Sequence, residues 1–154
     1  MKSSFILLVI FTCTILSCDA ALHANSIIHL TDSNYAIIPY TIADSGLFEK
    51  AKPATLTHLE IQEIETLTNK SIVKHNIKTT KWETIGKIDY KVQLVPVINE
   101  KGEKEVWINC FCSDFGHDWR KDIMYVDDGG SCFFNLKINL STKKYYDLSV
   151  NANI

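Results

Sequence analysis

The stretch that decides the fold is Tyr90–Cys112, which reads YKVQLVPVINEKGEKEVWINCFC. Its side chains alternate with the period of two that is typical of β-strands. Every second residue over positions 90–98 is apolar, and positions 106–112 carry Val, Ile, Cys and Cys at alternate places. Between the two runs, residues 99–103 form a turn in which Gly102 can adopt a positive φ. The stretch therefore predicts a β-hairpin with one apolar face.

The register of this hairpin follows from the length of its loop. A three-residue loop over residues 100–102 pairs Leu94 with Ile108 and Val92 with Cys110, apolar against apolar. A slip of one residue would set Leu94 opposite Asn109 and scatter the apolar face. We therefore expect the three-residue loop.

The last third of the chain repeats the pattern. The DDGG sequence at residues 127–130 is a strong turn signal, and apolar residues alternate from Cys132 to Leu140 after it. A second turn follows at residues 141–144, and the apolar face continues on a closing strand through Tyr146, Leu148 and Val150.

The segment between these two hairpins is harder to interpret. Trp119–Val126 predicts a strand that ends in residues 123–126, and a short helix over residues 118–122 is the alternative.

One helix is predicted over residues 56–75. Thr57 and Glu60 form a T-x-x-E capping box, which satisfies two backbone amides at the start of a helix. Glutamates lie in the first half and lysines in the second, as the helix dipole favours. One stripe at helical spacing is expected to face the sheet: Ile61, Ile64, Thr68, Ser71, Ile72 and His75. The opposite side is expected to hold Gln62, Glu65 and Asn69.

These elements predict an α+β fold in which one main helix packs on a four- to five-stranded antiparallel meander sheet. The order of elements resembles the cystatin-like arrangement of a helix on a curved sheet, and the resemblance rests on order alone. We expect a single domain over residues 54–154, preceded by a tether and irregular segment over residues 18–53 and a signal peptide over residues 1–17.

The N-terminal segment has the features of an export signal. Lys2 precedes the apolar stretch Phe5–Leu16, which is too short to span a membrane. Ile15-Leu16-Ser17-Cys18 resembles a bacterial lipobox, which implies cleavage before Cys18 and acylation of its thiol. Ordinary secretion with cleavage after Ala20 or Ala24 is the alternative. We therefore expect an exported protein, lipid-anchored in the cell envelope or facing the periplasm, or else secreted.

Composition and charge exclude several classes of protein. Apolar residues make up 46% of the chain and charged residues 22%, as in an ordinary globular domain. Sixteen basic and eighteen acidic residues give a formal charge of −2 over 154 residues. This balance shows no basic footprint for nucleic acid, and on net charge alone we expect no attraction to anionic lipid.

Three cysteines follow Cys18 in the predicted mature chain: Cys110, Cys112 and Cys132. The alternation puts all three on one face of the sheet. In an exported protein this favours a disulfide from Cys132 to Cys112 or to Cys110, with the third thiol buried.

Two chemical alternatives use the same residues. Cys110, Cys112, His117 and Cys132 are the ligand types of a tetrahedral zinc site. A catalytic thiol is the other alternative, with Cys112 as nucleophile, His117 as base and Asp114 or Asp118 orienting it. No family signature surrounds these cysteines.

A band of apolar residues lies on the face that alternation predicts to be free of cysteine. Val95, Trp107 and Phe111 are more apolar than a solvated face requires. They either pack under the N-terminal segment, which we favour, or form an exposed binding face.

The C-terminal half carries a resemblance. Trp107–Cys112, WINCFC, and Asp127–Asn135, DDGGSCFFN, are similar to the C-terminal sheet of small exported bacterial proteins or lipoproteins without an assigned function. The resemblance covers roughly residues 88–152. It implies no catalytic residue.

We therefore expect a small, non-enzymatic envelope lipoprotein or secreted domain that binds a protein or another envelope component. Its expected partners are the membrane, through the N-terminal lipid, and an unidentified envelope molecule. No cofactor is expected. The alternative is a zinc-binding or thiol-redox protein that uses Cys110, Cys112, His117 and Cys132.

Overall fold

The structure is a computed structural model that describes residues 26–41, 44 and 46–152. Cys18 of the predicted lipobox and the alternative cleavage sites after Ala20 and Ala24 lie outside the described residues. Within the described part of the chain, no helix is both long enough and apolar enough to cross a bilayer.

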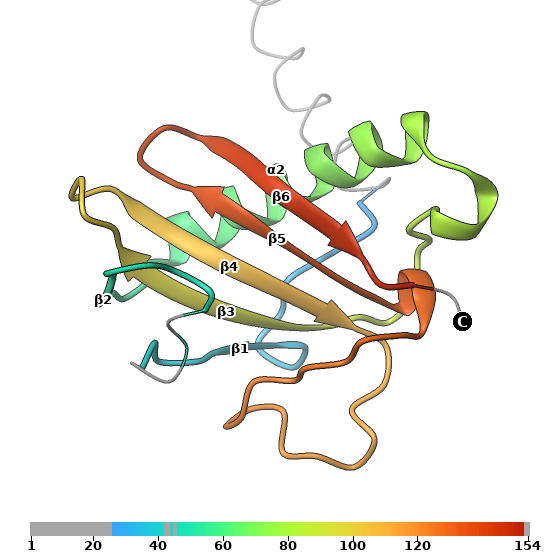
Figure 1. Cartoon of the computed structure of the whole chain (residues 1–154), viewed down its shortest axis with the longest axis horizontal. Coiled ribbons are helices and arrows are strands. Elements are labelled where there is room, and N and C mark those ends of the chain that lie inside the picture. The colour runs from blue at the N-terminus through green and yellow to red at the C-terminus, as the bar shows by residue number, and fades with distance from the viewer. Residues whose placement is uncertain (1–25, 42–43, 45, 153–154) are drawn as a thin grey trace, which may run out of the picture.

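One long helix covers one face of a mixed sheet (Figure 1). The sheet order is β1-β3-β4-β5-β6, and β2 also pairs with β3. The helix is α2 (His58–Lys78), and a short 3₁₀ helix, η2 (Lys81–Glu83), follows it. The strands are β1 (Tyr35–Ile37), β2 (Lys52–Pro53), β3 (Lys91–Ile98), β4 (Lys104–Phe111), β5 (Phe133–Asn139) and β6 (Lys144–Val150), with a second 3₁₀ helix, η3 (Gly130–Cys132), before β5.

The α+β class is confirmed, but the sheet is not purely antiparallel. β1 runs parallel to β3, with Tyr35 opposite Val92 and Ile37 opposite Leu94. A parallel pair needs a long crossover, and α2 supplies it between these two strands. Three residues are too few to show alternation, and this strand was therefore not predicted. The cystatin-like arrangement is not confirmed.

The central hairpin has the predicted register. Leu94 lies opposite Ile108 and Val92 opposite Cys110. Asn99 donates its backbone N–H to the carbonyl of Glu103 at 2.9 Å, which closes a loop over residues 100–102. Gly102 has a φ of 78°, the left-handed conformation that this loop requires.

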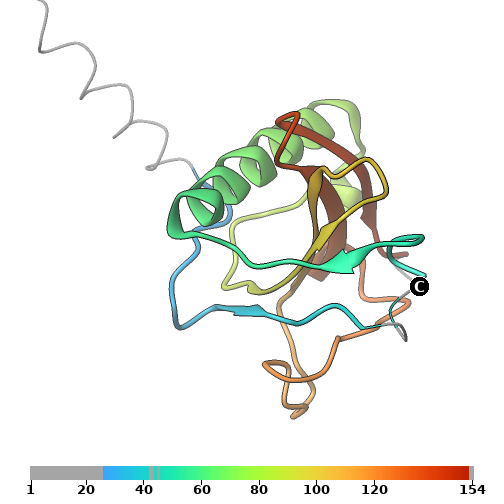
Figure 2. The same ribbon diagram turned by 90° about the vertical axis from the view of Figure 1, so that its left-hand side faces the viewer.

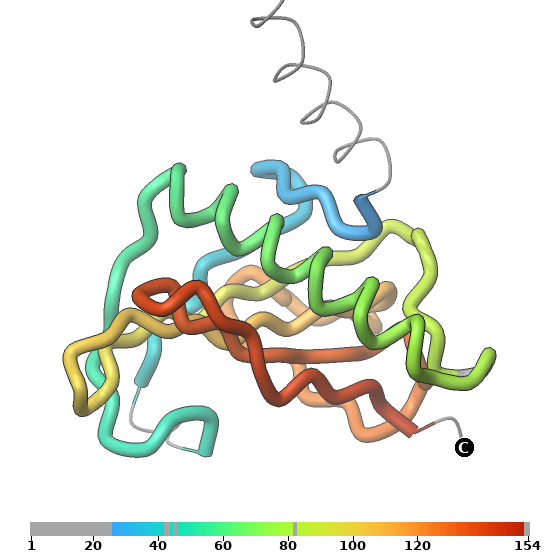
Figure 3. The backbone as a smooth tube through the Cα atoms, turned by 90° about the horizontal axis from the view of Figure 1, so that it is seen from above, coloured from blue at the N-terminus to red at the C-terminus, as the bar shows by residue number. Residues whose placement is uncertain are grey.

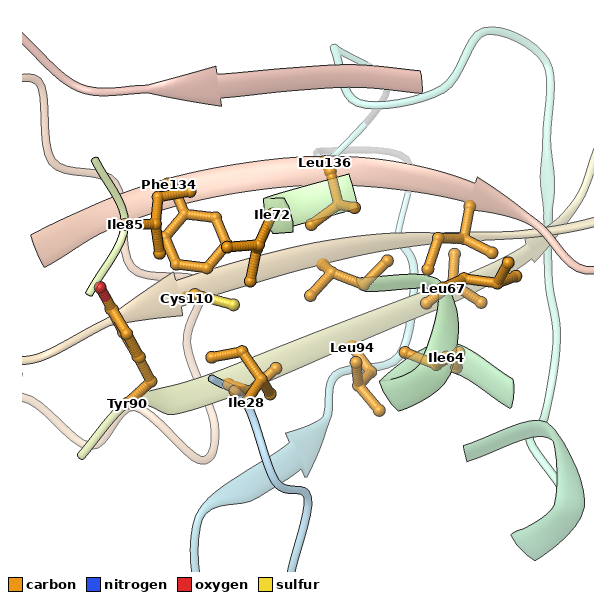
Figure 4. Close-up of a cluster of buried hydrophobic side chains, with 14 residues drawn as sticks. Ile28, Ile64, Leu67, Ile72, Ile85, Tyr90, Leu94, Cys110, Phe134 and Leu136 are labelled. Carbon is orange, nitrogen blue, oxygen red and sulfur yellow. The ribbon is translucent and has the colours of Figure 1, made fainter. Parts of the chain in front are cut away.

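The helix begins at the predicted capping box. The Thr57 side chain accepts from the Glu60 N–H, and the Glu60 carboxylate accepts from the Thr57 N–H at 2.7 Å. The helix packs on the sheet through a helix-side cluster (Figure 4), in which each fully buried Ile or Leu contributes about 1.5–3 kcal/mol. Its members are Ile28, Ile64, Leu67, Ile72, Ile85, Tyr90, Val92, Leu94, Val106, Ile108, Cys110, Phe134, Leu136 and Ile138.

One flank of the helix differs from expectation. Glu65 and Asn69 were expected on the solvent side, but Glu65 is buried and Asn69 is half-buried. The Asn69 amide oxygen accepts from the N–H groups of Ile27 and Ile28 at 2.8 and 3.0 Å, and Glu65 accepts from the Leu30 N–H at 2.9 Å. Residues 27–30 are therefore fixed along the helix, within the segment that was predicted to be a tether.

The opposite face of the sheet is also buried. Figure 2 shows α2 above the sheet and irregular segments below it, which makes three layers. The lower layer comes from residues 38–41, 46–51 and 119–126, and with the sheet it forms an outer cluster. Its buried members are Ala36, Ile38, Tyr40, Phe48, Val95, Val97, Trp107, Phe111, Trp119, Met124 and Phe133.

The strand expected within Trp119–Val126 is wrong, and so is the alternative helix over residues 118–122. The segment is a series of turns and extended residues. Trp119 and Met124 are nevertheless buried. The apolar residues pack against the sheet without joining its ladder.

The closing strand keeps Leu148 and Val150 of the predicted face, but Tyr145 takes the place of Tyr146. Tyr145, Leu148 and Val150 pack against the helix-side cluster, whereas Tyr146 is exposed. A bulge causes the change, because the register shifts between Asn135 and Lys137 and leaves two β6 residues opposite one on β5. One of the two is Asp147, whose φ is 51°.

Replacing Gly129 is expected to destabilise the fold. Gly129 has a φ of 90°, and a Cβ there would lie 2.6 Å from Cδ2 of Phe133. Gly129→Ala should lower the free energy of unfolding by about 2 kcal/mol or more, measured by urea denaturation. The matched control is Gly86→Ala, since nothing lies within 4 Å of its added Cβ. Equal stability of the two variants would contradict this packing.

Candidate functional site

The candidate site is the loop between β4 and β5, closed by a disulfide and called the disulfide loop below (residues 112–132). Cys112 and Cys132 are bonded, with their Cα atoms 5.3 Å apart and 20 positions apart in sequence. The Cys112 N–H also donates to the Cys132 carbonyl at 3.1 Å. Of the two pairings that the sequence left open for Cys132, the structure has the one with Cys112.

The three cysteines do not share one face. Cys110 is a free, buried thiol whose side chain lies in the helix-side cluster (Figure 4). Burial raises the pKa of the Cys110 thiol. Cys112 is exposed and Cys132 packs against the outer cluster. The prediction fails because β4 ends at Phe111 and Cys132 belongs to η3, so strand alternation extends to neither residue.

The zinc alternative does not assemble. Two of its four ligands are bonded to each other, Cys110 is buried on the other face of the sheet, and His117 is exposed. Over residues 26–41, 44 and 46–152, no group of three or more His, Cys, Asp or Glu side chains could hold a metal ion.

The catalytic-thiol alternative fails for a related reason. The Cys112 sulfur is bonded to Cys132 and is therefore not a thiolate. Asp114 pairs with Lys91, which holds the pKa of that carboxyl below its usual range. Asp118 pairs with Lys121 at 2.6 Å, and this pair likewise lowers the Asp118 pKa. Each of the two carboxylates proposed to orient His117 is thus paired with a lysine.

A buried amide pair holds the middle of the disulfide loop. Gln93 and Asn109 lie opposite each other on β3 and β4, and the Asn109 amide donates to the Gln93 oxygen at 3.1 Å. The Gln93 nitrogen donates to the carbonyls of Trp119 and Asp122 at 2.6 and 2.7 Å. The Gln93 oxygen accepts from the Met124 N–H at 3.0 Å. These two side chains replace the strand partner that this part of the loop lacks.

Arg120 ties the loop to the N-terminal segment. Its guanidinium lies 4.4 Å from the centre of the Trp119 ring, and it donates to the carbonyls of Ser33 and Tyr35 at 2.6 and 3.0 Å. The Trp119 ring in turn meets Phe111 edge-on, with centroids 5.9 Å apart. The loop is thus fixed by the disulfide at its base, by amides in its middle and by Arg120 at its side.

The proposed binding face lies inside the protein. Val95, Trp107 and Phe111 are 0%, 5% and 0% exposed, because the N-terminal segment and the disulfide loop cover them. Of the two interpretations of this band, packing inside the protein is therefore confirmed, and an exposed binding face is wrong.

Two aromatic side chains of the loop remain exposed. Phe115 is 63% and Tyr125 is 66% exposed. Phe115 stacks on Phe133 with centroids 5.8 Å apart, and Tyr125 lies beside Trp107 at 6.4 Å. Each exposed ring is thus supported by a buried one.

Sequence reasoning missed the amide pair and both exposed rings. The signal for the pair was available, since Gln93 and Asn109 interrupt the apolar band at positions that the predicted register sets opposite each other. No comparable signal distinguishes Phe115 or Tyr125 from the buried Trp119, because the loop has no period.

Comparisons of the chain with family models, with curated proteins and with solved structures found no match. The function is therefore inferred from the residues and geometry described above.

Removing the Gln93 side chain is expected to release the loop. Gln93→Ala would leave the Trp119 and Asp122 carbonyls and the Met124 N–H without their partner. The free energy of unfolding should fall by about 3 kcal/mol, and the Met124 amide should exchange faster with deuterium. Gln62→Ala, at an exposed helix position, is the control. Unchanged exchange at Met124 would show that the pair does not hold the loop.

Removing the disulfide is expected to destabilise the fold without abolishing it. The double variant Cys112→Ser, Cys132→Ser loses a cross-link with a sequence separation of 20. The chain-entropy model gives a loss of about 3 kcal/mol, measured by urea denaturation. Reductant should weaken the natural chain by a similar amount and leave the double variant unchanged. A natural chain that is indifferent to reductant would contradict the pairing.

Proposed function

We propose that this chain is a small, exported, lipid-anchored domain that binds a protein or another component of the cell envelope through its disulfide loop. The binding is non-enzymatic. The observation that carries the proposal is a loop that is fixed from within and still presents two aromatic rings, Phe115 and Tyr125, to solvent.

Export is supported by two independent features of the chain. The N-terminal sequence resembles a lipoprotein signal ending at Cys18. The Cys112–Cys132 disulfide is of the kind that persists in oxidising compartments outside the cytosol.

Binding is supported by the rigidity of the loop. A loop that is already ordered loses little conformational entropy when it meets a partner. Aromatic side chains dominate the energetics of protein interfaces, since they bury a large area with few rotatable bonds. Phe115 and Tyr125 combine both properties, because each rests on a buried ring.

A site-specific cross-linking experiment tests the loop. A photoreactive phenylalanine analogue is placed at position 115 or 125 of the full chain in its own cells and is then irradiated. We expect discrete adducts at both positions, because both side chains are more than half exposed on the loop. The matched control is position 59 on α2, where Leu59 is 75% exposed. Adducts at position 59 alone, or at none of the three, would refute a binding role for the loop.

A substitution at Cys18 tests the anchor. Cys18→Ser removes the thiol that would carry the diacylglycerol, so we expect an unprocessed precursor and loss of the acylated form. The readout is the intact mass of the membrane-extracted protein. Cys13→Ser, in the same signal segment, should leave the acylated form intact. A natural chain that begins at Ala21 or Asn25 without a lipid would show ordinary secretion instead.

A further inference from the structure

The second half of α2 and the segment after it carry a surface unlike the rest of the molecule. Within residues 66–88 all five lysines are exposed, together with three apolar side chains. Val73, Ile77 and Ile88 are 54%, 80% and 44% exposed. This set, called the lysine surface below, consists of Lys70, Val73, Lys74, Ile77, Lys78, Lys81, Lys87 and Ile88.

The charge of this region is opposite to that of the whole chain. Residues 66–88 contain five lysines and one acidic residue, Glu83, a formal charge of +4 in a chain of −2. None of the five lysines forms an ion pair with another residue that the structure describes. By contrast, Glu60 and Glu63 in the first half of the helix pair with Lys104 and Lys143 at 2.6 and 3.4 Å. The net charge of the chain therefore conceals a separated basic region.

Hydrogen bonds hold the parts of the lysine surface together. The Asn76 amide donates to the Ile85 carbonyl at 2.8 Å and accepts from the Ile85 N–H at 2.9 Å. The His75 ring lies 3.0 Å from the Glu83 carbonyl. The segment after α2 is thus fixed against the end of the helix, and Figures 1 and 3 show the two at the same end of the molecule.

The described chain begins beside this surface. Ser26 lines a cavity of about 430 Å³ together with Lys87 and Ile88. Seven residues separate Cys18 from Ser26 in the sequence. A fully extended chain spans at most about 29 Å between these two Cα atoms. An acyl group on Cys18 would therefore keep Ser26 within that distance of the bilayer, and with it the edge of the lysine surface at Lys87 and Ile88.

We propose that the lysine surface rests on a bilayer that contains anionic lipid. Each lysine near such a surface multiplies the bound population about fivefold, and exposed aliphatic side chains enter the headgroup region. The disulfide loop lies on the side of the sheet opposite α2 (Figure 2), so this orientation turns Phe115 and Tyr125 away from the membrane. The inference rests on the proposed function, because the lipid on Cys18 supplies the anchor.

The test uses the mature chain, residues 18–154, which contains every residue that the structure describes. A maleimide lipid is coupled to Cys18, because Cys110 is buried and the other two cysteines are bonded to each other. The chain is displayed on vesicles of phosphatidylcholine, with or without phosphatidylglycerol. Lysines are then acetylated with a water-soluble reagent, and the rate at each lysine is measured by mass spectrometry.

With phosphatidylglycerol present, acetylation of Lys70, Lys74, Lys78, Lys81 and Lys87 should slow several-fold. Lys52, Lys101 and Lys144, which are exposed elsewhere, should react at an unchanged rate in the same sample. The triple variant Lys70→Gln, Lys78→Gln, Lys87→Gln should restore fast acetylation of Lys74 and Lys81, as should high salt. The matched variant Lys52→Gln, Lys101→Gln, Lys144→Gln should not.

Equal rates on both kinds of vesicle, or protection of the control lysines, would overturn the proposed orientation. Because the lipid is attached chemically, this result does not depend on acylation in the cell. Failure of the anchor would be seen separately, as an unmodified N-terminus in the mass of the membrane-extracted protein.

Discussion

The Gln93–Asn109 pair is the constraint on which the lower layer of the molecule depends. Two amides opposite each other on neighbouring strands are buried in an apolar face, where an unpaired polar group costs about 1–3 kcal/mol. Each finds its partner in the backbone of the disulfide loop. The loop therefore has one position over the sheet, and that position brings Trp119 and Met124 into the outer cluster.

The two faces of the sheet are covered in different ways. Above it, α2 satisfies its own backbone with helical hydrogen bonds and meets the sheet through apolar side chains, so the helix-side cluster follows from periodicity. Below it, irregular chain must satisfy its own backbone, and it does so through side chains such as Gln93 and Arg120. Polar contacts fix the loop while two of its aromatic side chains, Phe115 and Tyr125, stay exposed. This arrangement suits the binding of a partner by the proposed site.

Periodicity explains how much of this could be predicted from the sequence. The capping box, the hairpin register and the helical stripe through Ile64 and Ile72 follow rules that extend over several residues. The missed features are local or long-range exceptions. The bulge at Asp147 placed Tyr145 instead of Tyr146 on the buried face of β6, and Asn69 bound a segment some forty residues away. For the candidate site, the Cys112–Cys132 pair was one of the two predicted pairings. The exposure of Phe115 and Tyr125 could not be predicted, because it depends on contacts within a loop that has no regular spacing.

The sheet ends on one side at β6, whose outer backbone groups face no neighbouring strand of the described sheet. A run of free amides and carbonyls on such a strand is a template for chains to join edge to edge. The kink at Asp147 breaks that run near its middle and adds a negative charge to it. Many copies crowded onto one surface would thus lack an uninterrupted border along which to polymerise.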